Sequence, residues 1–394
     1  MQGGLSMPYD FDTILHRKNT GCYKYDALKV FLGSDDLIPM WVADMDFACA
    51  PEIIEAMQKR LDQGVFGYNF RQSHFYDSLI AWVQKRHGWS MQRNWIMYTP
   101  GVVPALALAV SAFTKPGDGI LIQQPVYHPF SEIVTEHNRK LVVNQLIEDN
   151  LHYTMDYDSL DKQLAEVKLV FLCSPHNPVG RVWTESELLT FGRLCRKHKV
   201  IVIADEIHSD LIFSPHKHIP FASLEDFGQF TLTCYAPSKT FNVAGLATSA
   251  IITENMELHD IYDKLVFKRH LFYGNTFGIT ALDAAYQNGE AWLEELLKYL
   301  SSSKELVKKF IARELHQIHV CEPESTFLLW LDFRQLGISD EQLQEIMLKK
   351  AKIAMDPGTH FGMGGSGFMR MNYAFPKSVL EKALIQLKNA IKGS

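Results

Sequence analysis

The chain has 394 residues, of which 47% are hydrophobic and 21% charged, and its net charge of −6 gives nucleic acid no general electrostatic attraction. No stretch reaches the ~20 consecutive apolar residues of a membrane span, and residues 1–6 lack the basic-then-apolar pattern of a signal peptide. The six cysteines are scattered without a Cys-x-x-Cys pair, which is typical of core residues in a reducing compartment. We therefore expect a cytoplasmic protein with no nucleic-acid partner, no membrane partner and no metal site.

Helical patterns alternate with short strands rich in β-branched residues between about residues 51 and 286. Strands are predicted at 120–122, 169–173, 199–204, 231–235 and 250–252, and a helix is predicted at 105–113. Such alternation predicts a mostly parallel sheet with helices on both faces, so we expect an α/β fold for this part of the chain.

The last third of the chain has a different pattern. It predicts a long amphipathic helix at 290–315, a strand at 326–332, a helix at 339–351, a strand at 368–373 and a final helix from Lys377. This order predicts a smaller α+β domain at residues 287–394, after a large domain at 48–286. The Gly-rich residues 361–367 are either a mobile loop or a turn before an edge strand.

Polar or aromatic residues follow four of the predicted strands. Tyr127 comes after 120–122, Asn177 after 169–173, Asp205 directly after 199–204, and Lys239 after 231–235. Ligands bind outside the carboxyl ends of parallel strands, so these side chains are expected to line one pocket.

Lys239 and Asp205 indicate pyridoxal phosphate (PLP) as the cofactor. A lysine amine can hold an aldehyde cofactor as a Schiff base, and a buried aspartate can keep the pyridine nitrogen protonated, which makes the ring an electron sink. Each residue alone has an ordinary explanation, because lysines near strand ends are usually solvated and aspartates often cap helices. Asn177 could equally form an Asx turn before Pro178. The order of the four residues favours the cofactor site.

Several longer motifs occur in a fixed order along the chain. They are Met-Trp-Val-Ala-Asp-Met-Asp-Phe at 40–47, Phe-Gly-Tyr at 66–68, Gly-Val-Val-Pro at 101–104, Ser-Pro-His-Asn-Pro-Val-Gly at 174–180, Asp-Glu-Ile-His-Ser-Asp at 205–210, Ala-Pro-Ser-Lys-Thr-Phe-Asn at 236–242 and Gly-Phe-Met-Arg-Met-Asn at 367–372. With these motifs the chain resembles the fold-type I PLP-dependent enzymes of the aminotransferase class I/II superfamily, and within it the cystathionine β-lyase (C-S lyase) branch of MalY/PatB type. The resemblance implies a PLP-dependent transferase-like fold and places residues 1–47 with the smaller domain, at the active-site mouth.

The resemblance implies catalytic roles for three residues. Lys239 would bind the cofactor and remove the Cα proton of the substrate, Asp205 would pair with the pyridinium nitrogen, and Tyr127 would stack on the ring. Asn177 would donate a hydrogen bond to the cofactor's phenolic oxygen. His208 is expected near the same oxygen, where many aminotransferases carry a tyrosine, and its alternative role is to cap a following helix.

The resemblance also places the cofactor's phosphate at the start of the helix predicted after Gly-Val-Val-Pro. Val102 and Val103 would contribute backbone groups, since amides at a helix N-terminus favour anions, and Ser238 would contribute a hydroxyl. Tyr68 is expected to reach the phosphate of a neighbouring subunit, which implies a homodimer. The wider superfamily commonly carries Gly-x-Arg after the lysine, whereas this chain has Gly-Leu-Ala at 245–247, as fits the lyase branch.

Recognition of the small-molecule amino-acid substrate is assigned by the resemblance to Arg370. Its guanidinium is expected to clamp the α-carboxylate bidentately, and the alternative is an arginine on an exposed edge strand. Asn177 and backbone groups around Trp41 and Val42 are expected to complete this recognition.

The resemblance implies two main reactions that begin alike with removal of the Cα proton. Expulsion of a thiolate from Cβ gives pyruvate, ammonia and a thiol, and we favour this β-elimination from L-cystathionine or L-cysteine S-conjugates because a thiolate is a good leaving group. The alternative is an aminotransferase acting between an L-amino acid and a 2-oxo acid. A PLP-dependent regulatory protein is a third hypothesis, but no basic DNA-binding segment precedes Pro8.

Overall fold

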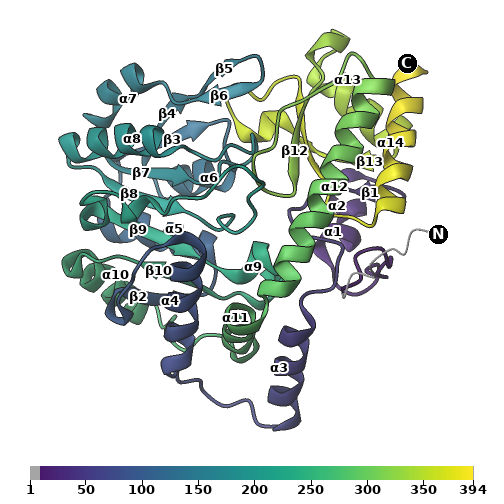
Figure 1. The fold of residues 1–394 in the computed structure, drawn as a ribbon. Coiled ribbons are helices and arrows are strands. Elements are labelled where there is room, and N and C mark those ends of the chain that lie inside the picture. Colours follow the sequence, from purple (N-terminus) through teal and green to yellow (C-terminus); the bar gives the residue numbers. More distant parts are fainter. Residues whose placement is uncertain (1–8, 394) are drawn as a thin grey trace.

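The centre of the fold is a seven-stranded sheet, seen in a computed structural model that describes residues 9–393 (Figure 1). Its strand order is β2 (Ile96–Thr99), β10 (Ser249–Ile252), β9 (Thr231–Tyr235), β8 (Ile201–Asp205), β7 (Val167–Cys173), β3 (Gly119–Gln124) and β4 (Lys140–Gln145). Within this sheet only β10 runs antiparallel to its neighbours. The predicted, mostly parallel sheet is therefore confirmed. The expectations for residues 1–6 lie outside the described range.

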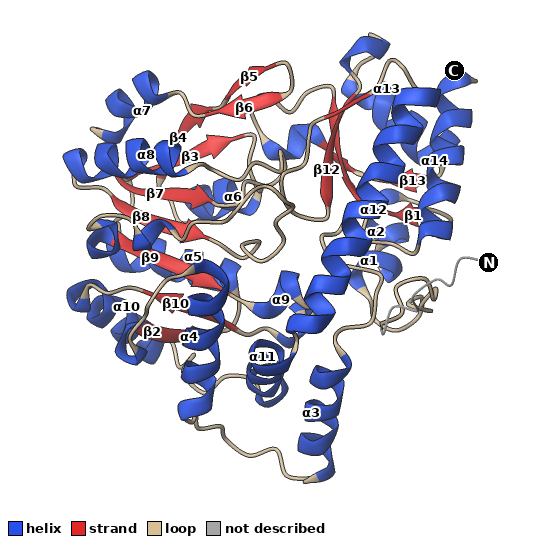
Figure 2. Cartoon of the chain, viewed as in Figure 1, coloured by secondary structure: helices blue, strands red, loops and turns tan. Residues whose placement is uncertain are grey.

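The apolar residues of β7 contribute to two hydrophobic cores, one on each face of the sheet. Leu169 and Phe171 belong to the core shared with α5 (Val102–Phe113), α6 (Pro129–Glu136) and α10 (Met256–Lys268). Val170 and Leu172 belong to the core shared with α7 (Tyr157–Leu164) and α8 (Glu185–His198). Successive strand residues point to opposite faces, so a continuous apolar strand needs helices on both sides, as Figure 2 shows.

A second, antiparallel sheet is formed by the C-terminal part of the chain. Its order is β11 (His319–Val320), β12 (Leu328–Asp332), β15 (Phe368–Asn372) and β14 (Asp356–Pro357), so β15 is an inner strand. The long helix α12 (Glu290–Glu314) and the last helix α14 (Lys377–Lys392) pack against each other beside it (Figure 1). The helix predicted at 339–351 begins as α13 (Asp340–Glu345) behind a Ser339 capping box and ends as a π-helical turn, Ile346–Ala351.

The N-terminal segment lies against this C-terminal part. It contains α1 (Tyr23–Asp26), α2 (Leu28–Leu32) and β1 (Ile38–Pro39), and β1 pairs in parallel with β13 (Ile353–Ala354). Leu28 and Leu37 bury their side chains against Ala354. Residues more than 300 positions apart in the sequence are thereby joined beside α14, as Figure 1 shows.

The remaining elements complete the large sheet's surroundings. They are α3 (Pro51–Asp62), α4 (Ser73–His87), α11 (Thr276–Asn288), the short α9 (Pro237–Thr240) and the hairpin of β5 (Ile147–Asp149) and β6 (His152–Thr154), and α11 packs against both α3 and α4. The six cysteines are free thiols, four of them buried. Within residues 9–393 no helix combines the length and apolarity needed to cross a bilayer.

Candidate active site

A cavity of about 730 Å³ opens at the carboxyl ends of β3, β7, β8 and β9. It gathers nearly all of the site residues predicted from the sequence: Val42, Val102, Val103, Tyr127, Asn177, Asp205, His208, Ser238, Lys239 and Arg370. Tyr68 is the exception, because it lies in the loop between α3 and α4, is 88% exposed and does not line the cavity of its own chain. The strand-end argument thus finds the pocket, because parallel strands end at one edge of the sheet.

Lys239 presents its amine to this cavity from the short helix α9. Pro237 occupies the first turn of α9, where its missing N–H costs no helical hydrogen bond, and the helix begins directly after β9. Nζ donates a hydrogen bond to the carbonyl oxygen of Ala43 at 2.6 Å. Burial, followed by the positive charge of Arg370, lowers the pKa of Lys239 to about 8. The neutral fraction of the amine near physiological pH is therefore minor but far larger than for an ordinary lysine, and this fraction can act as a nucleophile or base.

Asp205 ends β8 with a buried carboxyl group that faces the same cavity. Its Oδ1 accepts a hydrogen bond from the backbone N–H of Ile207 at 3.2 Å, and no ion pair to it is found among residues 9–393. Burial raises the pKa of Asp205 to about 6. A buried carboxylate without its own cation suits a positively charged ligand atom, whose arrival would lower that pKa again.

His208 lies one turn beyond Asp205 and is also buried against the cavity. Burial, followed by the charges of Lys239 and Arg370, holds its pKa well below the usual value, so the ring is neutral. Its Nδ1 has no hydrogen-bond partner within the described part of the chain. Turns rather than a helix follow His208, which argues against the capping role and leaves a buried polar atom for a ligand.

The segment that carries Asp205 and His208 is tied to α9 by Asp210. The buried Asp210 carboxylate accepts a hydrogen bond from the hydroxyl of Thr240 at 2.9 Å and from the indole N–H of Trp82 at 3.1 Å. Thr240 directly follows Lys239. Asp210 therefore fixes the two catalytic segments relative to each other, a role that its place in the sequence did not reveal.

Tyr127 and Asn177 also line this cavity. The backbone N–H of Tyr127 donates to the carbonyl oxygen of Asn177 at 3.1 Å, which links the loops after β3 and β7. Burial, followed by the negative charge of Asp205, raises the pKa of the Tyr127 phenol to about 12. The ring therefore remains neutral and offers an aromatic face to a planar ligand.

Arg370 lies on the inner strand β15 and is 3% exposed, so the alternative of an exposed edge-strand arginine is wrong. Its guanidinium donates to the Asn177 side-chain oxygen at 3.2 Å, to the carbonyl oxygen of Trp41 at 2.9 Å and to the Asp356 carboxylate at 2.8 Å. Nε has no partner within residues 9–393. A buried cation with an unpaired N–H beside an open cavity is suited to bind a carboxylate.

Asp356 is a functional residue that the sequence analysis missed. It lies directly opposite Arg370 in the pairing of β14 with β15, and a second contact joins it to Nδ1 of His360 at 2.9 Å. Although burial acts to raise the pKa of Asp356, the charge of Arg370 holds it below the usual value. The pair is created by strand register, and no local motif around Asp356 indicates it.

The N-terminal end of α5 borders the cavity at Val102, Val103 and Pro104. The preceding Gly101 has φ +123°, a conformation that favours glycine, and the helix starts at Val102 rather than at the predicted Ala105. Amides in the first turn of a helix have no intrahelical acceptor, so this end attracts anions. Ser238 also lines the cavity, and Ala247 lines it without a positive charge.

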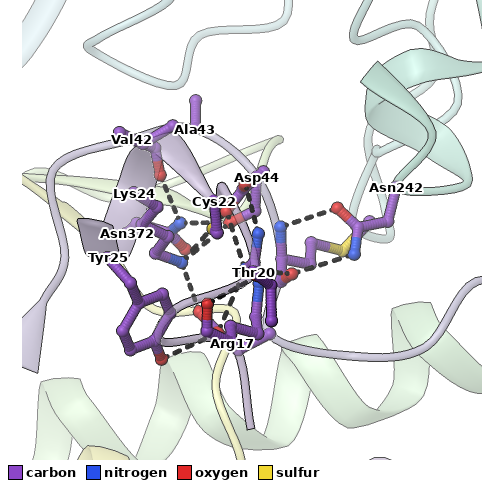
Figure 3. A network of polar contacts seen from close by, with 12 residues as sticks. Arg17, Thr20, Cys22, Lys24, Tyr25, Val42, Ala43, Asp44, Asn242 and Asn372 are labelled. Carbon is purple, nitrogen blue, oxygen red and sulfur yellow. Dashed lines mark hydrogen bonds and ion pairs between the residues drawn. The ribbon is translucent and has the colours of Figure 1, made fainter. Parts of the chain in front are cut away.

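A cluster of buried and partly buried charges holds the loop that carries Val42 and Ala43, as Figure 3 shows. Arg17 contacts Asp44 at 2.7 Å and Asp46 at 3.0 Å, and Lys24 contacts Asp44 at 3.3 Å and also bonds Asp46. A second set of contacts flanks the cluster: Asn372 donates to the carbonyl oxygen of Val42 at 2.7 Å, and Asn242 accepts from the N–H of Met45 at 2.9 Å. This charged cluster therefore fixes the Ala43 carbonyl beside Lys239.

These groups fit a planar, anionic aldehyde such as PLP. The start of α5 and Ser238 would hold the phosphate, the Tyr127 face would contact the ring, and Asp205 would meet the ring nitrogen. Lys239 supplies the amine for the aldehyde. Such a ligand explains why, within residues 9–393, the Asp205 carboxylate has no cation partner and Nδ1 of His208 has no hydrogen-bond partner.

Comparison with known proteins agrees with this site. The family model described as "Aminotransferase class I and II" matches residues 35–387. The chain is 43% identical to cystathionine beta-lyase PatB of Bacillus subtilis (strain 168), over 97% of this chain and 100% of the relative. Among solved structures, a PLP-bound putative aminotransferase from Clostridium difficile 630 superimposes with a TM-score of 0.96 at 44% identity, over 97% of this chain and 100% of that one. Cystalysin from Treponema denticola, described as containing a pyridoxal 5'-phosphate cofactor, superimposes with a TM-score of 0.95 at 38% identity, over 98% and 100%.

The agreement extends from fold to family. The α/β fold of type I PLP-dependent enzymes that the motifs predict is confirmed by the mostly parallel sheet and by both superpositions. Because the family model spans most of the chain and the identity runs nearly end to end, this chain belongs to the aminotransferase class I and II family.

Proposed function

We propose that this protein is a PLP-dependent C-S β-lyase that converts L-cystathionine or L-cysteine S-conjugates, with water, into pyruvate, ammonia and a thiol. The observation that carries this choice of reaction is the end-to-end similarity to the cystathionine beta-lyase PatB. His208 and the uncharged Ala247 support it, since both are the features by which the sequence resembles the lyase branch.

The side chains of the cavity suit the steps of such an elimination. Arg370 holds the substrate α-carboxylate, and Asn177 and the Trp41 carbonyl keep the guanidinium in place. Nζ of Lys239 takes the Cα proton, which its lowered pKa allows near neutral pH. Asp205 keeps a proton on the ring nitrogen of the cofactor. When bound, PLP supplies the electron sink for the pair left at Cα.

The test is product analysis without a 2-oxo acid. Purified protein loaded with PLP and given L-cystathionine is expected to release pyruvate and free thiol in equal amounts. The second candidate is an aminotransferase, favoured by the similar Clostridium difficile structure, which is described as a putative aminotransferase. Amino transfer that requires an added 2-oxo acid and releases no thiol would replace the lyase proposal with that one.

We also propose a cytoplasmic homodimer, a large domain at residues 48–286, and a small domain formed by 287–394 with the N-terminal segment to residue 47. Exposed apolar side chains support the dimer: Val65, Phe66, Tyr68 and Phe70 form one stretch of the loop between α3 and α4. The ring of Tyr68 lies 4.7 Å from that of Tyr273, another exposed aromatic. Such a patch is typical of an interface, and Tyr68 would reach the phosphate of the partner subunit across it. Analytical ultracentrifugation of the protein at micromolar concentration tests the dimer.

Replacement of Arg370 by lysine is expected to lower kcat/KM for L-cystathionine by about 100-fold, mainly through a higher KM. An ammonium lacks the planar fork that binds a carboxylate while contacting Asn177 and Asp356, and each charged hydrogen bond lost costs about 1.5–3 kcal/mol. Steady-state kinetics of pyruvate release measures the effect. Replacement of Arg313 by lysine, an arginine on the surface of α12, serves as the control, and equal kinetics for both variants would contradict the assigned role.

The rate at which the PLP-free protein takes up PLP is expected to rise with pH and to level off above about 8. Only the neutral amine of Lys239 attacks an aldehyde, and its pKa is lowered from 10.5 to about 8, so the reactive fraction grows through that pH. Stopped-flow absorbance of the bound cofactor measures the rate. An inflection near the ordinary lysine value of 10.5 would show that burial does not act on this amine as described.

A further inference from the structure

We propose that the mouth of the cavity is a subsite for an aromatic leaving group, formed by the side chains of Tyr23, Phe31 and Trp41. The inference rests on the proposed function, because it names the class of thioether that the same site prefers. The elimination breaks the Cβ–S bond with its electron pair leaving on sulfur, and the Cα proton passes to Nζ of Lys239. With S-benzyl-L-cysteine, one water then gives pyruvate, ammonia and benzyl thiol, so no oxidant or reductant is needed.

The three rings form one aromatic surface that borders the cavity. The centroids of Tyr23 and Trp41 lie 5.3 Å apart with an interplanar angle of 30°, and Phe31 lies 5.6 Å from Tyr23 and 6.3 Å from Trp41. All three residues line the cavity. The indole N–H of Trp41 donates to the carbonyl oxygen of Lys24 at 3.0 Å, so the charged cluster that fixes the loop also orients this ring.

Tyr23 and Phe31 are 57% and 60% exposed, although both are large aromatic side chains. Water therefore contacts a contiguous apolar surface at the mouth, and such surfaces are typical of binding sites. An aromatic ring placed on them would gain offset or edge-to-face contacts as well as apolar burial.

The polar contacts of the site direct the substrate's side chain toward this surface. Arg370 bonds the carbonyl oxygen of Trp41 and Lys239 bonds that of Ala43, so a substrate held by both lies along residues 41–43. The cofactor fits the inner end, between Asp205 and the start of α5. The group on Cβ can then extend outward, past Trp41 to Tyr23 and Phe31, which line the same cavity.

The chemistry of this outer wall favours an apolar group over a charged one. The N-terminal segment contributes Tyr23, Phe31, Leu32, Trp41, Val42 and Ala43 to the cavity, and none of them carries a charge. His360, which also lines the cavity, already pairs with Asp356. A leaving group with a charged amino-acid end would lose water here without gaining an ion pair, whereas a benzyl group would lose only unfavourable hydration.

The test compares kcat/KM for S-benzyl-L-cysteine and S-methyl-L-cysteine, measured as pyruvate release by the PLP-loaded protein. The double variant Tyr23→Ser/Phe31→Ser is expected to lower the benzyl-to-methyl ratio by about tenfold, the effect of losing an apolar contact surface. The control is Val30→Ser, because Val30 is 79% exposed on the same helix as Phe31 but does not line the cavity, and it should leave the ratio unchanged. Any loss of folded protein cancels within the ratio, and the different leaving tendencies of the two thiolates cancel when the ratio of a variant is divided by that of wild type.

Two other outcomes overturn the inference, and they are distinguishable. If wild-type protein releases pyruvate from both thioethers but the double variant keeps the ratio within about twofold, the subsite is wrong while the lyase function stands. This result would also follow if a partner subunit covered Tyr23 and Phe31. If wild-type protein releases pyruvate from neither thioether nor from L-cystathionine, the lyase function and the subsite fail together.

Discussion

Replacement of Lys239 by alanine is expected to lower kcat for pyruvate release from L-cystathionine by about 10⁴-fold or more. The change removes the group that attaches the cofactor and also the base that takes the Cα proton. No second amine can substitute, because within residues 9–393 Lys239 is the only lysine that lines the cavity. A coupled assay for pyruvate measures the rate, and the absorption spectrum of the bound cofactor reports the lost attachment.

Two further variants make this result specific. Lys239→Arg keeps a positive charge but cannot be deprotonated in a protein, so it should be as inactive as Lys239→Ala if the amine acts as a base. Lys309→Ala removes an exposed lysine from α12 and should retain full activity. Turnover by Lys239→Ala above about 1% of wild type would show that another group takes the Cα proton.

The fold and the inner part of the site could be predicted because their signals are local. The strand at 231–235 was predicted at its observed bounds, and a residue that directly follows a buried parallel strand must lie at the ligand-binding edge. Asp205 is the last residue of β8, and Lys239 lies in the short helix α9 that begins just past β9, so both lie at this edge. Their neighbours in sequence therefore identify the pocket without any knowledge of distant contacts.

The outer part of the site depends on contacts that no local pattern encodes. Asp356 meets Arg370 through strand register, and the carbonyl of Ala43 meets Lys239 through a loop some 200 residues away in sequence. No pattern around Lys24 in the sequence predicts a buried ammonium, yet its side chain is fully buried. Such features follow from tertiary packing, where charges can be buried only because partners arrive from other segments.

The role of the glycines at 361–367 could not be predicted from the sequence for a different reason. A Cβ on Gly365 would lie 1.9 Å from the backbone oxygen of Gly358, and one on Gly362 would lie 2.2 Å from the side chain of Gln124. The glycines therefore permit close approach of neighbouring segments, and the strand that follows is an inner one rather than the predicted edge. Composition alone does not distinguish close packing from mobility.

Replacement of Lys24 by methionine is expected to lower the free energy of unfolding by about 3–5 kcal/mol. The Lys24 ammonium is fully buried between Asp44 and Asp46, and methionine fills a similar volume without a charge. The variant therefore leaves two carboxylates with one cation, Arg17, which is costly at a site where Asp46 is only 3% exposed. Urea unfolding followed by circular dichroism measures the loss.

The matched control is Lys59→Met, because Lys59 pairs with Glu55 at 2.8 Å on the exposed face of α3 and exposed pairs contribute about 0.5 kcal/mol or less. Equal losses for the two variants would show that burial does not increase the contribution of the cluster to stability.

Measurements at acid pH should distinguish the two variants further. Although burial acts to raise the pKa of Asp44, Arg17 and Lys24 hold it below 3.8, so its contribution to stability is present above that pH and is lost as pH falls through the lower folded-state pKa. Without Lys24 the pKa of Asp44 moves upward, and part of its contribution to stability disappears. The difference in free energy of unfolding between wild type and Lys24→Met should therefore narrow as the pH falls below about 4. The corresponding difference for Lys59→Met should stay small at every pH.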